Sequence, residues 1–417
     1  MRSATDTKKI SLMIPDVLKG KRIIVGVTGG IAAYKSCLII RSLVSRGAEV
    51  RVIMTPAAKE FITPLTLSTL SGNEVILNMF PKSQDENLKV NPWHIEYGIW
   101  ADLMIIAPAT INTVAKISNG FADNALTAVV HALRCPLLVA PAADMDMYKH
   151  RTHLQNLGKL IELGYHICEA EEGFLASGLS GPGRMAEVDK IIDFAESIIS
   201  GFTPDLSGKK ILISAGPTFE DIDPVRYIGN RSSGKMGYEL AKAAYIRGAE
   251  VTLISGPSHE KCYPEISKIN IRSAAEMKLA IESKISENQI LIMSAAVADY
   301  KPLTVADKKI KKESDFQNIP LTETEDILAS IKKEGKIVIG FALETNNEIE
   351  NASSKLKKKN LDLIVLNSLK DEGAAFEHPT NKVSIISRTG NIKEYPILSK
   401  FQTANNILSE IVSSGLV

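Results

Sequence analysis

Short apolar runs recur along this chain, and longer stretches between them place apolar residues every three or four positions. Runs this short, with β-branched and aliphatic residues in succession, are typical of strands buried on both faces of a parallel sheet. The runs are 23–27, 49–54, 103–107 and 137–140 in the first half, and 211–214, 251–255, 290–293, 337–341 and 363–366 in the second half. The alternation of strands and helices predicts an α/β fold with one doubly wound, mostly parallel sheet in each half.

The length of 417 residues exceeds what one hydrophobic core usually organises, so two domains are expected. The pattern breaks at 200–208, where glycine, proline and serine cluster, and a new apolar run begins directly afterwards. We therefore predict a first domain over 1–200, a linker over 201–208 and a second domain over 209–417. Residues 380–395 have the pattern of an antiparallel hairpin that turns at 389–391, and a closing helix should follow.

The composition, 45% hydrophobic and 23% charged, is that of a globular protein. A net charge of +1 provides no general attraction to anionic polymers or surfaces, so neither nucleic acid nor membrane is expected as a partner. The four cysteines are scattered, which favours reduced thiols over a disulfide framework or a zinc site. Because we find neither a signal peptide in 1–20 nor an apolar run long enough to span a bilayer, we expect a cytoplasmic protein.

Two strands run into glycine turns that lead to helices. The first turn is Thr28-Gly-Gly30, and the second begins at Gly216 but reaches its helix only after a long detour over 218–235. Each opening leaves backbone N–H groups and a helix N-terminus available to an anion. The chain is therefore predicted to bind two phosphate-bearing ligands at two active sites, beyond the carboxyl ends of the strands.

The first turn reads Gly26-x-x-Gly-Gly30 rather than the dinucleotide pattern, and the second strand ends in Thr55 without an acidic ribose ligand. These features disfavour NAD. The hydroxyls of Thr28, Thr55 and Thr110 suit one phosphate and a polyol chain, as in a mononucleotide flavin. A glycine turn that serves only helix–strand packing remains the alternative.

The segment Gly229–Met236 nearly matches a P-loop, but Met236 stands where the magnesium-binding hydroxyl should be. It also lies too far beyond the preceding strand, so we reject a P-loop NTPase. Residues 232–235, entering a helix predicted over 236–247, can still hold a phosphate through backbone N–H groups and Lys235.

Segments 26–35, 93–96, 108–113 and 141–148 together resemble the homo-oligomeric flavin-containing cysteine decarboxylases, and most closely the decarboxylase half of the bifunctional coenzyme A biosynthesis family. The resemblance implies a flavodoxin-like domain with FMN as cofactor. It also implies a redox-neutral decarboxylation, in which the flavin takes electrons from the thiol-bearing carbon before carbon dioxide leaves and returns them afterwards. The implied FMN contacts are Thr28, Gly29, Gly30, Ile31, Thr55, Pro108, Ala109, Thr110 and Asn112.

By the same resemblance, His94 is the acid/base group in a ligand-facing loop, although a lone histidine is more often structural. Met147 belongs to the substrate-binding motif, and two positions depart from the family pattern. Asp144 replaces an asparagine that would hold the substrate carboxylate, so it must be protonated or balanced by a cation. Ser177 replaces a cysteine proposed as proton donor; serine is a far weaker acid, and a water positioned by Ser177 could substitute.

Segments 214–237, 294–300, 309–312 and 340–346 closely resemble phosphopantothenate–cysteine ligase, a Rossmann-like domain. Bacterial members convert 4′-phosphopantothenate and CTP into an acyl-cytidylate, from which cysteine displaces CMP, and Mg2+ is expected with the triphosphate. The resemblance implies that Asn230 binds the acyl-cytidylate, that Arg226 supports this region and that Lys309 assists the triphosphate and the second half-reaction. The remaining implied contacts are Ala295 and Ala296 for phosphopantothenate, and Asp299, Phe341, Lys355 and Lys359 for the nucleotide.

Each of these ligase residues has an ordinary structural alternative. The lysines of 308–312 and 355–359 could be solvated surface groups, and Asp299 with Arg226 could form an ion pair. The expected partners are 4′-phosphopantothenate, cysteine and CTP. The resemblance implies a homo-oligomer, trimeric through the first domain and dimeric through the second, and we expect a dodecamer.

Two rival functions remain open from the sequence. One is a flavin-dependent decarboxylase of peptidyl cysteine, which would have no use for the ligase half. The other is a non-catalytic or ligase-only flavoprotein in which Asp144 and Ser177 have silenced the decarboxylase.

Overall fold

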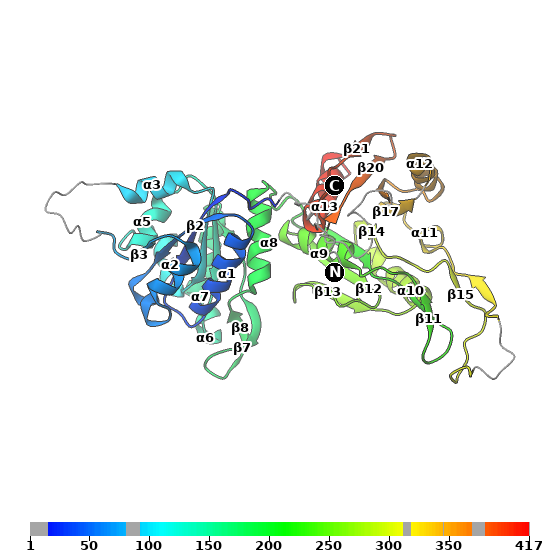
Figure 1. The fold of residues 1–417 in the computed structure, drawn as a ribbon, viewed down its shortest axis with the longest axis horizontal. Coiled ribbons are helices and arrows are strands. Elements are labelled where there is room, and N and C mark those ends of the chain that lie inside the picture. Colours follow the sequence, from blue (N-terminus) through cyan, green and yellow to red (C-terminus); the bar gives the residue numbers. More distant parts are fainter. Residues whose placement is uncertain (1–15, 81–91, 312–317, 345, 369–379, 417) are drawn as a thin grey trace, which may run out of the picture. The chain divides into compact units, whose positions relative to one another are not determined.

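The computed structural model describes residues 16–80, 92–311, 318–344, 346–368 and 380–416. The backbone contacts divide the chain into two compact units, and the boundary along the sequence lies between Phe202 and Thr203. The first unit runs from blue to green in Figure 1 and the second from green to red. Each is described by itself below.

The first unit is built on a six-stranded parallel sheet with the order β3-β2-β1-β4-β5-β6. Its strands are β1 (Arg22–Val27), β2 (Glu49–Met54), β3 (Val75–Ile76), β4 (Leu103–Ala109), β5 (Leu137–Pro141) and β6 (His166–Ile167). The four strands predicted from the apolar runs form the centre of this sheet, and β3 and β6 are two-residue edge strands. The predicted doubly wound fold is confirmed.

Helices cover both faces of this sheet because successive strand residues point to opposite sides. Ile23 and Val25 of β1 belong to the core shared with α1 (Ala33–Ser45), α2 (Pro64–Ser71) and α8 (Val188–Ile199). Ile24 belongs to the core shared with α4 (Ile111–Ser118), α5 (Ala125–Ala132) and α7 (Arg151–Glu162). The remaining elements are η1 (Pro56–Glu60), α3 (Trp93–Trp100), α6 (Met145–Tyr148) and the hairpin of β7 (Glu171–Phe174) and β8 (Ser180–Arg184).

The second unit contains an eight-stranded sheet with the order β13-β12-β9-β14-β17-β18-β20-β21. The first six strands are parallel: β9 (Lys210–Ala215), β12 (Glu250–Ser255), β13 (Ser267–Asn270), β14 (Ile290–Met293), β17 (Ile337–Glu344) and β18 (Leu363–Ser368). The last two, β20 (Val383–Ser387) and β21 (Ile392–Glu394), form an antiparallel hairpin, as predicted for 380–395. The predicted closing helix is α13 (Lys400–Ser413).

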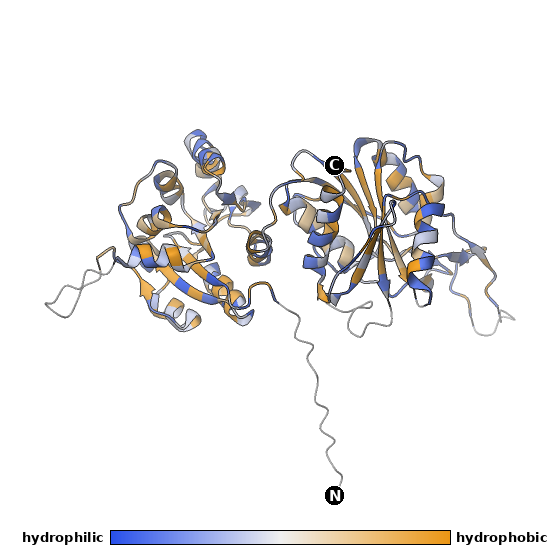
Figure 2. Ribbon diagram, turned by 90° about the horizontal axis from the view of Figure 1, so that it is seen from above, coloured by the Kyte–Doolittle hydropathy of each residue, from blue (hydrophilic) through white to orange (hydrophobic). Residues whose placement is uncertain are grey.

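Helices again cover both faces, and Figure 2 shows the mainly hydrophobic strands of each sheet enclosed by helices of mixed hydropathy. One core contains α9 (Lys235–Ile246) and α13, and the other contains α10 (Ala274–Lys284), α11 (Ile327–Ser330) and α12 (Glu348–Lys358). The other elements are η2 (Ile285–Glu287), β10 (Phe219–Asp221) with β11 (Tyr227–Gly229), β15 (Tyr300–Pro302) with β16 (Leu321–Glu323), and β19 (Thr380–Asn381) with β22 (Leu398–Ser399). Within the described residues, no helix combines the length and apolarity that crossing a membrane requires.

Candidate functional sites

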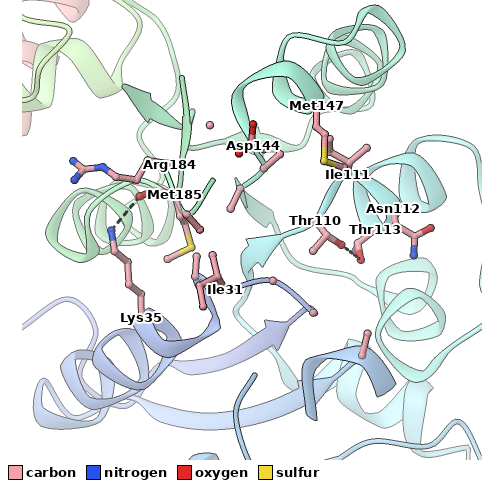
Figure 3. Close-up of a pocket in the computed structure, with 18 of the residues that line it drawn as sticks. Ile31, Lys35, Thr110, Ile111, Asn112, Thr113, Asp144, Met147, Arg184 and Met185 are labelled. Carbon is pink, nitrogen blue, oxygen red and sulfur yellow. Dashed lines mark hydrogen bonds between the residues drawn. The ribbon is translucent and has the colours of Figure 1, made fainter. Parts of the chain in front are cut away.

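A cavity of about 1220 Å3 lies beyond the carboxyl ends of the central strands of the first unit. This is the edge at which ligands bind in open α/β sheets. Figure 3 shows side chains from the α1, α4, α6 and β8 regions converging around the cavity. The sequence-predicted residues that line it are Gly29, Gly30, Ile31, Thr55, Thr110, Asn112, Asp144 and Met147.

The turn between β1 and α1 can only be built with glycine. A Cβ atom at Gly29 would lie 2.6 Å from Ala57 Cβ and 2.8 Å from the Ala57 carbonyl carbon. The helix begins at Ala33 without a side-chain cap at Ala32. Ala33 N and Lys35 N donate to the carbonyl groups of Gly30 and Ala32, at 2.9 and 3.0 Å, so no side chain occupies the space in front of this helix N-terminus. A helix N-terminus of this kind favours an anion through its dipole.

Thr28, Pro108 and Ala109 lie behind the cavity wall rather than in it. The Thr28 hydroxyl is fully buried, donates to Pro108 O at 2.7 Å and accepts from Thr110 N at 2.9 Å. Both of its polar functions are thus used in joining the β1 turn to the end of β4. The Thr28 hydroxyl therefore holds the turn against β4, and none of the three residues lines the cavity.

Thr55, by contrast, has a hydroxyl that needs a partner. The residue is 8% exposed and lines the cavity at the end of β2, and its Oγ1 has no hydrogen-bond partner among the residues that the structure describes. A buried hydroxyl without a partner is destabilising, and such groups usually mark a missing ligand or water. The orphaned hydroxyl, the uncapped α1 and the glycine turn fit the phosphate and polyol chain of FMN.

We therefore predict that Thr55→Val lowers flavin affinity about tenfold, because one buried hydrogen bond to the ligand is lost. Titration of flavin-free protein with FMN, followed by flavin fluorescence, measures this. Thr69→Val is the matched control, since the Thr69 hydroxyl bonds Leu65 O within α2 and lies outside the cavity. Equal affinities in the two variants would contradict a flavin contact at Thr55.

Three of the charged residues that line the cavity, Lys35, Arg184 and Glu187, form a connected group that the sequence analysis did not predict. Lys35 Nζ lies 3.2 Å from Glu187 Oε1 and donates to Met185 O at 3.2 Å, as Figure 3 shows for the latter contact. Arg184 pairs with Glu187 at 3.3 Å and with Glu171 at 3.2 Å. Two features could have indicated these residues. Lys35 is the last residue of segment 26–35, which carries the resemblance to flavin-containing decarboxylases. Arg184 follows Gly183, at which a Cβ atom would lie 2.3 Å from Ala143 O.

The two positions that depart from the family pattern differ in their relation to the cavity. Asp144 is half-buried, lines the cavity and precedes α6 as its N-cap residue. Ser177 is exposed beyond the end of β7, where its Oγ accepts from Leu179 N at 3.4 Å. Its neighbours Leu175 and Ala176 line the cavity, whereas Ser177 does not.

His94 lies in a helix, which corrects the expectation of a loop. Pro92 precedes α3, and the helix packs against α5 so closely that a Cβ at Gly98 would lie 2.2 Å from Ala132 O. The His94 ring is half-buried and stands edge-on to Trp93 at 5.9 Å between centroids. Apolar residues alternate over 93–99, which is a strand pattern, so the local sequence did not predict this helix. His94 does not line the cavity of its own chain.

A second cavity, of about 580 Å3, lies beyond the carboxyl ends of β14 and β17 in the second unit. The predicted residues Asn230, Ala295, Ala296, Asp299, Phe341, Lys355 and Lys359 all line it. Parallel strands bring these distant segments to one edge of the sheet. Asn230 fixes the loop after β14, because its Nδ2 donates to Ala296 O and Val297 O, each at 3.1 Å.

The two predicted lysines have different electrostatic surroundings. Lys359 forms an ion pair with Asp326 at 3.0 Å. Burial lowers the pKa of Lys355, and the positive charge of Lys359 lowers it further. An anionic ligand beside Lys355 would offset both effects.

Arg226 and Lys309 do not line this cavity. Arg226 donates through Nε to Asp223 Oδ2 at 3.0 Å, so its ion-pair partner is Asp223 and not Asp299. Arg226 Nη2 also donates to Ile310 O at 3.0 Å, and Asp223 Oδ2 accepts from Ile310 N at 3.2 Å. Arg226 and Asp223 thereby hold the residue next to Lys309, whose side chain is exposed.

Comparisons with known proteins also divide the chain into two parts, each of which contains one of the two cavities. A model of the flavoprotein family matches residues 14–200, and a model of the C-terminal domain of DNA/pantothenate metabolism flavoproteins matches residues 206–414. The fold and the two cavities thus define a flavoprotein joined to a DNA/pantothenate metabolism domain.

Curated relatives align over nearly the whole chain. The coenzyme A biosynthesis bifunctional protein CoaBC of Bacillus subtilis strain 168 is 42% identical over 401 residues, covering 95% of this chain and 98% of the relative. The protein of the same name from Escherichia coli K12 is 41% identical over 404 residues, covering 95% and 98%. A protein named cysteine/cysteine sulfinic acid decarboxylase, from an unknown prokaryotic organism, is 48% identical over 362 residues, covering 84% and 99%. The chain belongs to the family of bifunctional coenzyme A biosynthesis proteins.

Proposed function

We propose that this protein ligates 4′-phosphopantothenate with cysteine at the second cavity and decarboxylates 4′-phosphopantothenoyl-cysteine to 4′-phosphopantetheine at the first. One observation carries the proposal: two separate cavities lie at the carboxyl edges of two parallel sheets, and each is lined by motif residues of one half of the family. The end-to-end alignment with bifunctional relatives supports both activities in one chain. The first domain, 1–200, then carries the decarboxylase and the second, 209–417, the ligase.

The ligase must turn a carboxylate into an electrophile. Transfer of CMP from CTP forms an acyl-cytidylate and releases pyrophosphate, and the cysteine amine then displaces CMP to form the amide. Lys355 and Lys359 supply positive charge against the nucleotide phosphates, while Asp299 and Phe341 contact the nucleotide and Asn230 contacts the acyl-cytidylate. Ala295 and Ala296 offer a small, apolar wall to phosphopantothenate.

The expected Mg2+ does not need a site made of protein carboxylates. Among the described residues, no group of three or more His, Cys, Asp or Glu side chains is arranged to hold a metal ion. Mg2+ commonly enters such enzymes on the phosphates of its nucleotide and keeps several waters. We therefore propose that it arrives as a complex with CTP.

The decarboxylase needs an electron sink, because a cysteine amide cannot delocalise the electrons left when carbon dioxide departs. FMN, when bound, would supply that sink as a reversible acceptor of the electrons of the thiol-bearing carbon. Gly29, Gly30 and Thr55 would hold the phosphate and polyol chain, while Asp144 and Met147 face the substrate. His94 would take the thiol proton, since a histidine can accept a proton near neutral pH.

His94 can serve this role if a neighbouring subunit completes the site. The residue does not line the cavity of its own chain, and Ile95 and Ile99 beside it on α3 are 40% and 50% exposed. Exposed apolar residues next to a catalytic candidate suit an interface between copies. We propose a trimer through the flavin domains, with dimeric ligase domains completing a dodecamer.

Asp223 is proposed as a positioning residue for Lys309 because it holds Ile310 directly. Asp223→Asn should lower the ligation rate about tenfold, by freeing the loop that carries Lys309, and leave decarboxylation unchanged. Asp221→Asn is the matched control, since Asp221 lies on the same hairpin as Asp223 but pairs with Arg272, which precedes α10. Pyrophosphate release measures ligation; an unchanged rate in Asp223→Asn would contradict the positioning role.

A second candidate is favoured by the cavity residue Asp144 and by one relative. The protein named cysteine/cysteine sulfinic acid decarboxylase suggests a free amino acid as substrate for the first domain. The remaining alternative is a protein that only ligates, because Asp144 and Ser177 have silenced its decarboxylase.

Mass spectrometry separates these functions. Purified protein is incubated with 4′-phosphopantothenate, cysteine, CTP and Mg2+, and in parallel with cysteine or cysteine sulfinate alone. The proposed function predicts the cysteinyl adduct and its CO2-depleted product in the first reaction. The adduct alone would indicate a silent decarboxylase, and CO2 release from a free amino acid would favour the second candidate.

A further inference from the structure

A group of polar side chains at the second cavity comes from the C-terminal part of the chain. Lys400 is the first residue of α13, and Asn381 lies in β19. Antiparallel pairing of β19 with β22 places Asn381 opposite Leu398, two residues before Lys400. Both side chains line the cavity together with Lys235, the first residue of α9.

Lys400 is a buried cation without a close counter-ion. It is 7% exposed, and among the described residues its ammonium has neither a hydrogen bond nor an ion pair. Its pKa is lowered because burial disfavours the charged form and because the charge of Lys235 repels it, while Glu260 and Glu239 act in the opposite sense. Glu239 is itself paired with Lys242 at 3.3 Å. Two cations that face one cavity are unfavourable unless an anion joins them.

The Asn381 amide nitrogen is a weakly used donor beside Lys400. It is 2% exposed, and among the described residues its Oδ1, an acceptor that a phosphate oxygen cannot satisfy, has no hydrogen-bond partner. Within the described part of the chain, its Nδ2 donates to the sulfur of Met236, at 3.7 Å, and to no oxygen. Because a thioether is a weak acceptor, this amide can donate to a ligand oxygen at little cost.

The loop before α9 offers further donors. Ser232 Oγ accepts from Gly234 N at 3.2 Å, and Ser233 Oγ accepts from Lys235 N at 3.3 Å. Both serines line the cavity. Since their oxygens act as acceptors in these contacts, their O–H groups remain available to donate to an anion.

We propose that Lys400 and Asn381, with Lys235 and the two serines, form an anion subsite that binds a phosphate group of a ligase substrate. The inference rests on the proposed ligase function for the identity of the substrate. The phosphate belongs either to the triphosphate of the nucleotide or to the 4′-phosphate of the acid. These two sources share one recognition chemistry and are separated by experiment.

The test is Lys400→Met in the full-length chain, which removes the charge and keeps the length of the side chain. Isothermal titration with inorganic pyrophosphate, CTP and 4′-phosphopantothenate, each alone, measures binding without turnover. We expect about a tenfold loss of affinity for pyrophosphate and for one of the two substrates. The substrate that loses affinity is the one whose phosphate occupies the subsite.

Two further variants keep the test decisive. Lys400→Arg retains the charge and should retain the affinity, whereas Lys357→Met, on the exposed side of α12, should bind as the wild type. Unchanged affinity of Lys400→Met for all three ligands would overturn the subsite, even with ligation intact. Weaker pyrophosphate binding by Lys400→Met would support the subsite even if the wild-type protein made no ligation product, and that second result would refute the proposed function.

Discussion

The His94→Asn protein is expected to release carbon dioxide from 4′-phosphopantothenoyl-cysteine about a thousandfold more slowly than the wild type. Asparagine keeps a polar group of similar size at this position but cannot accept the thiol proton. Ligation and bound flavin should persist, because His94 lines neither cavity of its own chain. Carbon dioxide release, flavin absorbance and pyrophosphate release measure the three quantities separately. Unchanged carbon dioxide release would refute the role of His94.

The shared site makes a stronger test possible through mixed oligomers. Gly29→Val should lose flavin, since even a Cβ would lie 2.6 Å from Ala57 Cβ, and should therefore be inactive as a decarboxylase. Co-expression of Gly29→Val with His94→Asn should restore part of the activity, because an intact flavin cavity can then meet an intact His94 from a neighbouring subunit. Retained ligation in each parent variant shows that the chains are folded. Absence of any restored activity would contradict the contribution of His94 across subunits.

A loss of similar size is expected in ligation when Asn230 is replaced by aspartate. The Asn230 amide donates to two carbonyl oxygens at 3.1 Å, and a carboxylate at the same place would repel both. It would also repel the phosphate-bearing acyl-cytidylate, so ligation should fall about a thousandfold, corresponding to roughly 4 kcal/mol. Pyrophosphate release in the presence of CTP measures the effect, and flavin content and decarboxylation should be unchanged.

Asn288→Asp is a suitable control for this substitution. Its Nδ2 also donates to a carbonyl oxygen, that of Lys284 at 2.8 Å, but Asn288 lies at the amino end of β14, away from the cavity. This variant reports the general cost of placing a carboxylate against a carbonyl group. Comparable ligation rates in the two aspartate variants would show that Asn230 has no special part in the reaction.

Much of the fold was predictable because it depends on local sequence. Runs such as 23–27 and 290–293 are apolar at every position, and only a strand covered on both faces buries all of them. The glycine turn at Gly29 was also recognisable, since close backbone approach leaves no room for a side chain. The hairpin over β20 and β21 followed from its turn residues.

The sequence by itself thus determined the two α/β sheets, their ligand-binding edges and the motif residues placed there. Only the tertiary structure decided which side chains face a cavity. Thr28 was expected in the flavin site, but its hydroxyl is used by Pro108 and Thr110. Lys400 and Asn381 reach the second cavity because β19 pairs with β22, a contact that local periodicity does not encode. Periodicity reports which face of an element is buried, whereas the composition of a cavity depends on which distant elements become neighbours.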